Sequence, residues 1–166
     1  MSVFRALANN MNQEEKDVNR TEIRDLLIKH EGMVLTPYSD SLGHLTLGVG
    51  RALHLNPLTE EEAIYLLNND IEKVIKQLDV HWIAWRSLPY KAQLVCVDMA
   101  FQLGIHGFLG FKRTRLLMEK GEFTKASEEC LDSKWALQTP RRAEYNSRQL
   151  YLCQQQAKTN KIPPKD

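Results

Sequence analysis

The chain has 166 residues, of which 43% are hydrophobic and 26% charged, and it carries a formal net charge of +1 at neutral pH. This length and composition are typical of one soluble globular domain, or of two small lobes that share a core. No apolar run approaches the roughly 18 residues that span a membrane, so we expect no stable membrane insertion. The three cysteines and five histidines show no metal-ligand spacing, so we expect no metal site and no cofactor.

The charges are unevenly distributed along the chain. Residues 1–110 contain 10 Lys and Arg against 14 Asp and Glu, whereas residues 111–166 contain 12 against 7. A basic C-terminal half favours a polyanion such as nucleic acid or the bacterial wall, although solvated helix faces give the same pattern. Residues 1–10 contain no signal-peptide core, which predicts synthesis in the cytoplasm. Residues 1–18 form an N-terminal extension whose role the sequence leaves open.

The first predicted element is a helix that begins after Asn19. Asn19 is a suitable N-cap with Glu22 three residues on, and apolar residues follow at helical spacing. Gly32 ends the helix directly after Glu31. The carboxylate of Glu31 is therefore expected to project from a helix C-terminus.

A β-hairpin is predicted next, because glycines and Pro37 break any helix between residues 37 and 50. Leu45, Leu47 and Val49 alternate with His44, Thr46 and Gly48, which indicates a half-buried strand. We expect the three apolar residues to share the buried face and Thr46 to point the other way. Gly48 would leave room there for a ligand to approach the backbone.

The remaining elements are predicted to be helical. Thr59 and Glu62 form a capping box ahead of an amphipathic helix to about residue 78, a second helix runs from Ser87 to Gly104, and shorter helices cover 112–120 and 124–131. A last helix runs from Thr139 to about 157, and 158–166 is expected to be a mobile tail. The predicted fold class is α+β, mostly α. A small β-hairpin lobe (19–58) and a helical lobe (82–157) are joined by a long helix (60–78), with a cleft between them.

Glu31, Asp40 and Thr46 are the candidate catalytic residues. A hairpin that folds back beside the helix end would bring all three together. Cleavage of a glycosidic bond needs one acid for the leaving oxygen and a second group that handles water, and a hydroxyl near the second carboxylate can hold that water. The alternative is that both acids are solvated surface residues, because two carboxylates nine residues apart are common.

The segment around these residues resembles the catalytic segment of phage-type lysozymes, glycoside hydrolase family 24. Glu31-Gly32 is followed by residues 38–50, in which Asp40, Thr46 and Gly48-Val49-Gly50 stand in the register of that family. The similarity extends over roughly residues 22–152, with further matches at 59–70, 100–104, 110–111, 133–135 and 138–143.

The resemblance implies a lysozyme-like fold and a role for each residue. Glu31 would be the general acid, and ionised Asp40 together with Thr46 would position the attacking water, with inversion at the sugar. An inverting site holds its two carboxyl groups roughly 6.5–9.5 Å apart. Phe101 and Thr114 match positions that contact the glycan, and Arg142 matches an arginine near the catalytic Glu. Phe101 as a core residue and Arg142 as a solvated helix residue remain alternatives.

Two departures from the family pattern concern the hairpin. Arg51 stands where the family often has a histidine, and if that histidine pairs with the acid at the position of Asp70, Arg51 would make a permanent ion pair instead. The connection from Arg51 to Thr59 is also short, so the small lobe is expected to be little more than a hairpin.

The resemblance thus implies a peptidoglycan hydrolase, acting without a cofactor as a monomer. It would cut the β-1,4 bond from N-acetylmuramic acid to N-acetylglucosamine, reaching the wall in the periplasm after the membrane is permeabilised.

A catalytically inactive wall-binding relative is one alternative. A nucleic-acid-binding helical protein is another, supported by the basic side chains of 112–115 and 141–142, but no reading helix or stacking set accompanies them. A lytic transglycosylase would not need Asp40 and Thr46. A dinucleotide-binding protein is rejected, because Gly48-Val49-Gly50 lacks the third glycine of a dinucleotide-binding loop.

Overall fold

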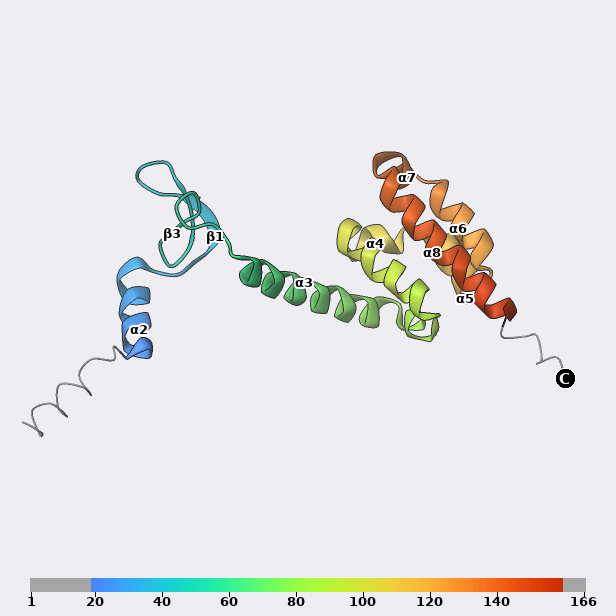
Figure 1. The fold of residues 1–166 in the computed structure, drawn as a ribbon, viewed down its shortest axis with the longest axis horizontal. Coiled ribbons are helices and arrows are strands. Elements are labelled where there is room, and N and C mark those ends of the chain that lie inside the picture. Colours follow the sequence, from blue (N-terminus) through green and yellow to red (C-terminus); the bar gives the residue numbers. More distant parts are fainter. Residues whose placement is uncertain (1–18, 160–166) are drawn as a thin grey trace, which may run out of the picture. The chain divides into compact units, whose positions relative to one another are not determined.

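The computed structural model describes residues 19–159, which form two compact units (Figure 1). The N-terminal unit extends to Glu62, and the helical unit begins at Ala63. The predicted N-terminal extension (1–18) and residues 160–166 of the predicted tail lie outside the described residues. The predicted lobe limits and the cleft between the lobes stay predictions.

Helix α2 (Arg20–Glu31) begins and ends where the sequence predicts. The Asn19 side chain accepts hydrogen bonds from the backbone N–H groups of Thr21 at 3.0 Å and Glu22 at 3.4 Å. These bonds satisfy amides that have no partner inside the helix. Gly32 adopts a φ of 75° and donates its N–H to the carbonyl oxygen of Ile28 at 2.9 Å, which ends the helix at Glu31.

Three antiparallel strands follow, where the sequence predicts a hairpin. They are β1 (Val34–Ser39), β2 (Leu45–Gly48) and β3 (Arg51–Ala52), in the order β1-β2-β3. The predicted hairpin corresponds to β1 and β2, although sequence reasoning set no bounds for β1, which contains Pro37, and did not predict β3. A proline is tolerated here because β1 is an edge strand, and the pairing with β2 is irregular between Val34 and Tyr38.

The predicted faces of β2 are wrong. Thr46 is only 3% exposed, whereas Leu45 is 51% exposed, and Leu47 and Val49 are half-buried. Thr46 lies in the central strand and pairs with Tyr38 on one side and with β3 on the other, so its small side chain is covered. Alternation of apolar residues located the strand correctly but did not show which face is buried.

Helix α3 (Glu60–His81) starts with the predicted capping box and runs three residues beyond the predicted end. Glu62 N–H donates to Thr59 Oγ1 at 3.2 Å, and Thr59 N–H donates to Glu62 Oε2 at 2.8 Å. Of its predicted apolar stripe, Val74 and Leu78 are buried. The core of the helical unit therefore packs against the C-terminal half of α3.

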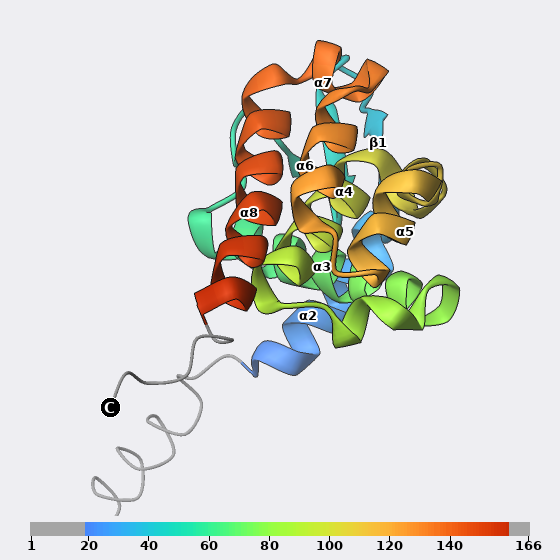
Figure 2. The same cartoon turned by 90° about the vertical axis from the view of Figure 1, so that its right-hand side faces the viewer.

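The rest of the helical unit consists of a short 3-10 helix and five α-helices. These are η1 (Ile83–Ser87), α4 (Tyr90–Leu109), α5 (Lys112–Glu119), α6 (Phe123–Leu131), α7 (Lys134–Gln138) and α8 (Pro140–Thr159). Helix α8 packs against α6, α4 and α7, and Figure 2 shows α6 and α8 side by side. Because α8 continues through Thr159, the first two residues of the predicted tail are helical. The predicted class, α+β and mostly α, is confirmed.

Helix α4 departs from expectation in two ways. It does not end at Gly104, which forms a kink with a φ of 70° before the helix resumes to Leu109. It is also the one helix within residues 19–159 that is long and apolar enough to cross a membrane, contrary to the composition-based prediction. Seven of its residues are buried in the helical unit, and the central helix of a folded core has the same length and apolarity, so this is weak support for a membrane span.

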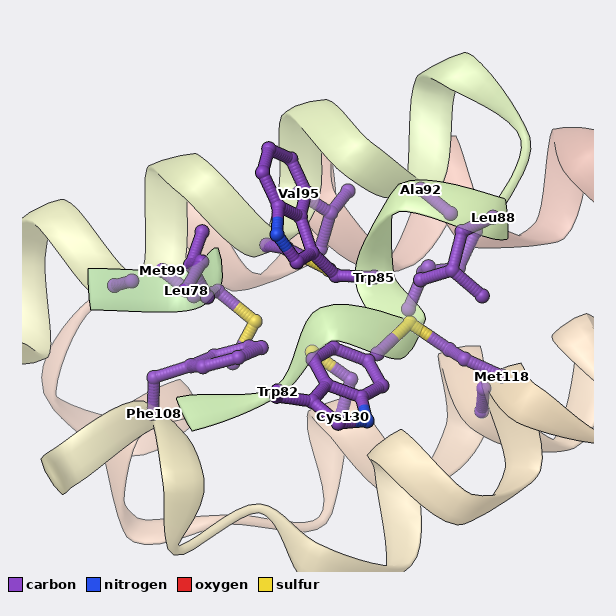
Figure 3. Close-up of a cluster of buried hydrophobic side chains, with 14 of the residues drawn as sticks. Leu78, Trp82, Trp85, Leu88, Ala92, Val95, Met99, Phe108, Met118 and Cys130 are labelled. Atoms are coloured by element: carbon purple, nitrogen blue, oxygen red, sulfur yellow. The ribbon is translucent and has the colours of Figure 1, made fainter. Parts of the chain in front are cut away.

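The hydrophobic core lies in the helical unit (Figure 3). Trp82 and Phe108 pack with ring centroids 5.7 Å apart, and Leu78 and Met99 are fully buried beside them. All three cysteines are buried, as predicted, and burial raises the pKa of the Cys130 thiol to about 12.

Truncation of Phe108 tests this core. Phe108 is fully buried, so Phe108→Ala is expected to lower the free energy of unfolding by about 3–5 kcal/mol, measured by urea denaturation. Phe101, in the same helix, is 41% exposed, and Phe101→Ala is the matched control with an expected loss of about 1 kcal/mol or less. Equal losses in the two variants would contradict the assigned core.

Candidate active site

Glu31 is placed by the end of α2 and by the turn between β2 and β3. Gly50 lies in that turn with a φ of 62°, and a Cβ built on it would lie 2.9 Å from Glu31 Oε2. The Glu31 carboxyl group therefore lies against the backbone of Gly50. A side chain at residue 50 would occupy the space that this carboxyl group fills.

The substitution Gly50→Ala is therefore expected to displace the Glu31 carboxyl group. The turn loses about 1 kcal/mol of stability because alanine disfavours a positive φ. Turnover of the glycan substrate that the family resemblance implies is expected to fall by about 10–100-fold, because a shift of about 1 Å in a reacting group is costly. Gly121→Ala is the matched control, since Gly121 has a φ of 72° and no atom within 4 Å of a built Cβ. Similar turnover in both variants would show that the contact between Gly50 and Glu31 does not matter.

Asp40 follows β1 directly and is fixed by the turn that leads into β2. Its Oδ1 accepts hydrogen bonds from the backbone N–H groups of Leu42 at 2.9 Å and His44 at 2.8 Å. The backbone N–H of Asp40 donates to the carbonyl oxygen of His44 at 2.9 Å. The amide hydrogen bond from His44, aided by that from Leu42, holds the pKa of the Asp40 carboxyl below its usual range despite partial desolvation. Asp40 is thus held as a carboxylate.

Thr46 lies on β2 and is bonded to the same residue as Asp40. Its Oγ1 donates to the carbonyl oxygen of His44 at 3.1 Å. Because this bond uses the hydroxyl hydrogen, the lone pairs of Oγ1 can act only as hydrogen-bond acceptors. The backbone of His44 therefore links the carboxylate of Asp40 to the hydroxyl of Thr46.

The N-terminal unit thus holds all three candidate catalytic side chains on or beside one small sheet. Glu31 lies against the β2–β3 turn, Thr46 is in β2, and Asp40 is in the β1–β2 turn. A carboxyl group, a fixed carboxylate and a hydroxyl are the groups that acid-assisted hydrolysis of a glycosidic bond requires. Their catalytic roles, and the predicted gap between the two carboxyl groups, stay predictions.

Arg51 forms a permanent ion pair, but its partner is Glu62 and not Asp70. Its guanidinium donates to both carboxylate oxygens of Glu62, at 2.5 and 2.9 Å, and to the backbone carbonyl oxygens of Asn56 at 2.8 Å and Pro57 at 2.5 Å. The Asp70 carboxylate pairs with Lys73 at 3.0 Å. The short connection after β3 explains the difference, because it brings the first turn of α3 to Arg51.

This pair also ties the capping box of α3 to the sheet. The backbone N–H of Thr59 and then the Arg51 guanidinium lower the pKa of Glu62. Arg51 therefore supports the sheet that holds Thr46, which is a structural role that sequence reasoning assigned to the wrong partner.

The other predicted site residues belong to the helical unit. Phe101 and Arg142 line one pocket, of about 390 Å³, and the half-exposed ring of Phe101 argues against the alternative that it is a core residue. Thr114 is buried and lines a second pocket beside Arg113 and Glu129, which form an ion pair at 3.1 Å. Their contact with a glycan stays a prediction.

Arg142 is bound to Asp98, a residue that sequence reasoning missed. Arg142 donates from Nε to Asp98 Oδ2 at 2.9 Å and from Nη2 to Oδ1 at 2.6 Å, and Asn146 adds a hydrogen bond to Oδ2 at 2.7 Å. Burial raises the pKa of Asp98, but these hydrogen bonds outweigh it and the net pKa is lowered. Arg142 is therefore not a freely solvated helix residue, while its predicted place near the catalytic Glu stays untested.

Metal-ligating side chains are scattered. Within residues 19–159, no group of three or more His, Cys, Asp or Glu side chains is arranged to hold a metal ion.

Comparison with known proteins identifies the family of the chain. The family model described as phage lysozyme matches residues 28–145, which include Glu31, Asp40 and Thr46. Two similar proteins are the probable T4-type lysozymes 1 and 2 of Dictyostelium discoideum, each 24% identical over 74% of this chain and 89% of the relative. The pre-baseplate central spike protein Gp5 of Enterobacteria phage T4 is 26% identical over 72% of this chain, but the match covers only 26% of that protein. The lysozyme-like fold expected from the sequence is confirmed.

Proposed function

Because the chain belongs to the phage lysozyme family, a family of peptidoglycan hydrolases, we propose that it cleaves one defined bond with inversion. That bond is the β-1,4 link from N-acetylmuramic acid to N-acetylglucosamine. The observation that carries the proposal is the joint attachment of Asp40 and Thr46 to the backbone of His44, in the unit that holds Glu31 against Gly50.

Each of the three side chains has one task in the reaction. Glu31 donates a proton to the glycosidic oxygen as the bond breaks, which makes the departing sugar a good leaving group. Asp40 accepts a proton from the attacking water, and Thr46 accepts a hydrogen bond from the same water. Direct attack by water from the opposite face inverts the anomeric centre, because no covalent sugar–enzyme intermediate forms.

The place of action is part of the proposal. The enzyme is made in the cytoplasm and acts as a monomer on the wall, in the periplasm of a Gram-negative cell. A separate protein permeabilises the membrane so that the enzyme reaches its substrate.

Product analysis on purified peptidoglycan tests the proposal. Hydrolysis with inversion of a β-linkage releases new reducing ends that are first α-configured, as NMR recorded during the first turnovers shows. Fresh β-anomers would contradict inversion, and anhydro ends in the mass spectrum would indicate a lytic transglycosylase. An inactive wall-binding relative would sediment with the walls and release no fragments.

A further inference from the structure

The proposed mechanism assigns no role to the imidazole side chain of His44. Its backbone already serves both Asp40 and Thr46, and its imidazole Nδ1 lies 3.6 Å from Asp40 Oδ2. The two amide hydrogen bonds of Asp40 go to Oδ1, so Oδ2 is the oxygen that faces the imidazole. A separation of 3.6 Å is too long for a hydrogen bond but short enough for electrostatic orientation.

The imidazole of His44 is itself held by a second ring. The ring of His54 lies 4.0 Å from it, centroid to centroid, with an angle of 31° between the planes. His54 follows β3, and the adjacent Leu53 N–H donates to the carbonyl oxygen of Leu45 at 2.9 Å. This bond anchors the segment of His54 next to β2, so the stacking is built on the sheet and not on a free loop.

We propose that His44 is a positioning residue for Asp40, and that the ring of His54 fixes the imidazole in place. The inference rests on the proposed function, in which Asp40 takes a proton from water. The amide bonds pin Oδ1, and the imidazole beside Oδ2 limits rotation of the carboxylate. Because the imidazole stays beyond hydrogen-bond distance, it leaves Oδ2 free to accept the proton.

Two substitutions at His54 separate ring stacking from other roles. His54→Ala removes the ring and is expected to lower kcat by about 3–10-fold while KM changes less than about twofold, because Asp40 acts on the water and not on glycan binding. His54→Phe keeps an aromatic ring and restores most of the kcat lost in the Ala variant. His44→Ala removes the imidazole itself and lowers kcat at least as much as His54→Ala. Release of reducing ends from soluble wall fragments gives both constants.

A matched control comes from the helical unit. His81 also has a ring neighbour, His106 at 5.9 Å, so His81→Ala removes a paired imidazole far from Asp40 in the sequence and should leave kcat unchanged. Unchanged kcat in His54→Ala, a rise in KM alone, or equal damage by Ala and Phe would overturn the inference. A wild-type protein that releases no reducing ends would contradict the proposed function itself, and this inference with it.

Discussion

Glu31→Gln is expected to abolish nearly all hydrolysis of peptidoglycan, with kcat lowered by about 10²–10⁴-fold. Glutamine has almost the same shape as glutamic acid and fits the same space against Gly50, where the Glu31 side chain makes its contact. It has no proton to give to the leaving oxygen. The loss therefore falls on the chemical step, measured as reducing ends released per enzyme from purified walls.

A second carboxylate on the same helix provides the control for this prediction. Glu22 lies in the first turn of α2 and is exposed, so Glu22→Gln removes one charge from α2 without touching the sheet. Both variants should keep the circular dichroism spectrum of the wild type, and their free energies of unfolding in urea should lie within a few tenths of a kcal/mol of the wild-type value. If Glu31→Gln kept more than about a tenth of wild-type turnover, Glu31 would not be the general acid.

Signals confined to a few consecutive residues predicted the element boundaries well. Asn19 caps α2 and Gly32 ends it, and Thr59 with Glu62 forms the capping box of α3, all as read from the sequence. The two N-terminal caps depend on side chains that bond to backbone groups two or three residues away, and Gly32 ends α2 because glycine readily adopts a positive φ. Such bonds follow from local sequence alone, so no knowledge of the fold was needed.

Features that depend on neighbouring strands could not be predicted in the same way. Thr46 is covered because it lies in the middle strand, yet the sequence predicted a two-stranded hairpin without β3. A strand of alternating residues offers two faces, and hydrophobicity alone favoured the wrong one. The partner of Arg51 was missed for a similar reason, since it depends on the path of the short connection to α3.

The candidate site shows the same division. The spacing of Glu31, Asp40 and Thr46 could be read from the sequence and matches the family. The groups that hold these side chains in place could not be read from it. His44 acts through its backbone groups, and a backbone contact leaves no signature in residue type. Gly50 stands in the Gly-x-Gly register of the family, but the sequence does not show that it lies against Glu31. The sequence therefore predicts which side chains react, and the structure shows what holds them.

Asp40→Asn is expected to lower kcat by about 10²–10⁴-fold with little loss of structure. The asparagine carbonyl oxygen can still accept the N–H groups of Leu42 and His44, which keep the turn before β2 in place. The variant has no negative charge and cannot take a proton from water. Asp40→Ala is the comparison, because it removes the charge and the acceptor together. It should therefore lose turnover and also destabilise the turn.

The pH dependence of stability gives this prediction a second readout. The folded pKa of Asp40 is lowered, chiefly by the amide N–H of His44, so ionised Asp40 stabilises the fold at all pH values above the unfolded pKa of about 3.9. That contribution is lost as the pH falls through the lower, folded pKa. The difference in free energy of unfolding between wild type and Asp40→Asn should thus be constant near neutral pH and should vanish in strong acid. A stability difference that widens on acidification would contradict the lowered pKa of Asp40, and an Asn variant with near-normal turnover would show that Asp40 is not the base.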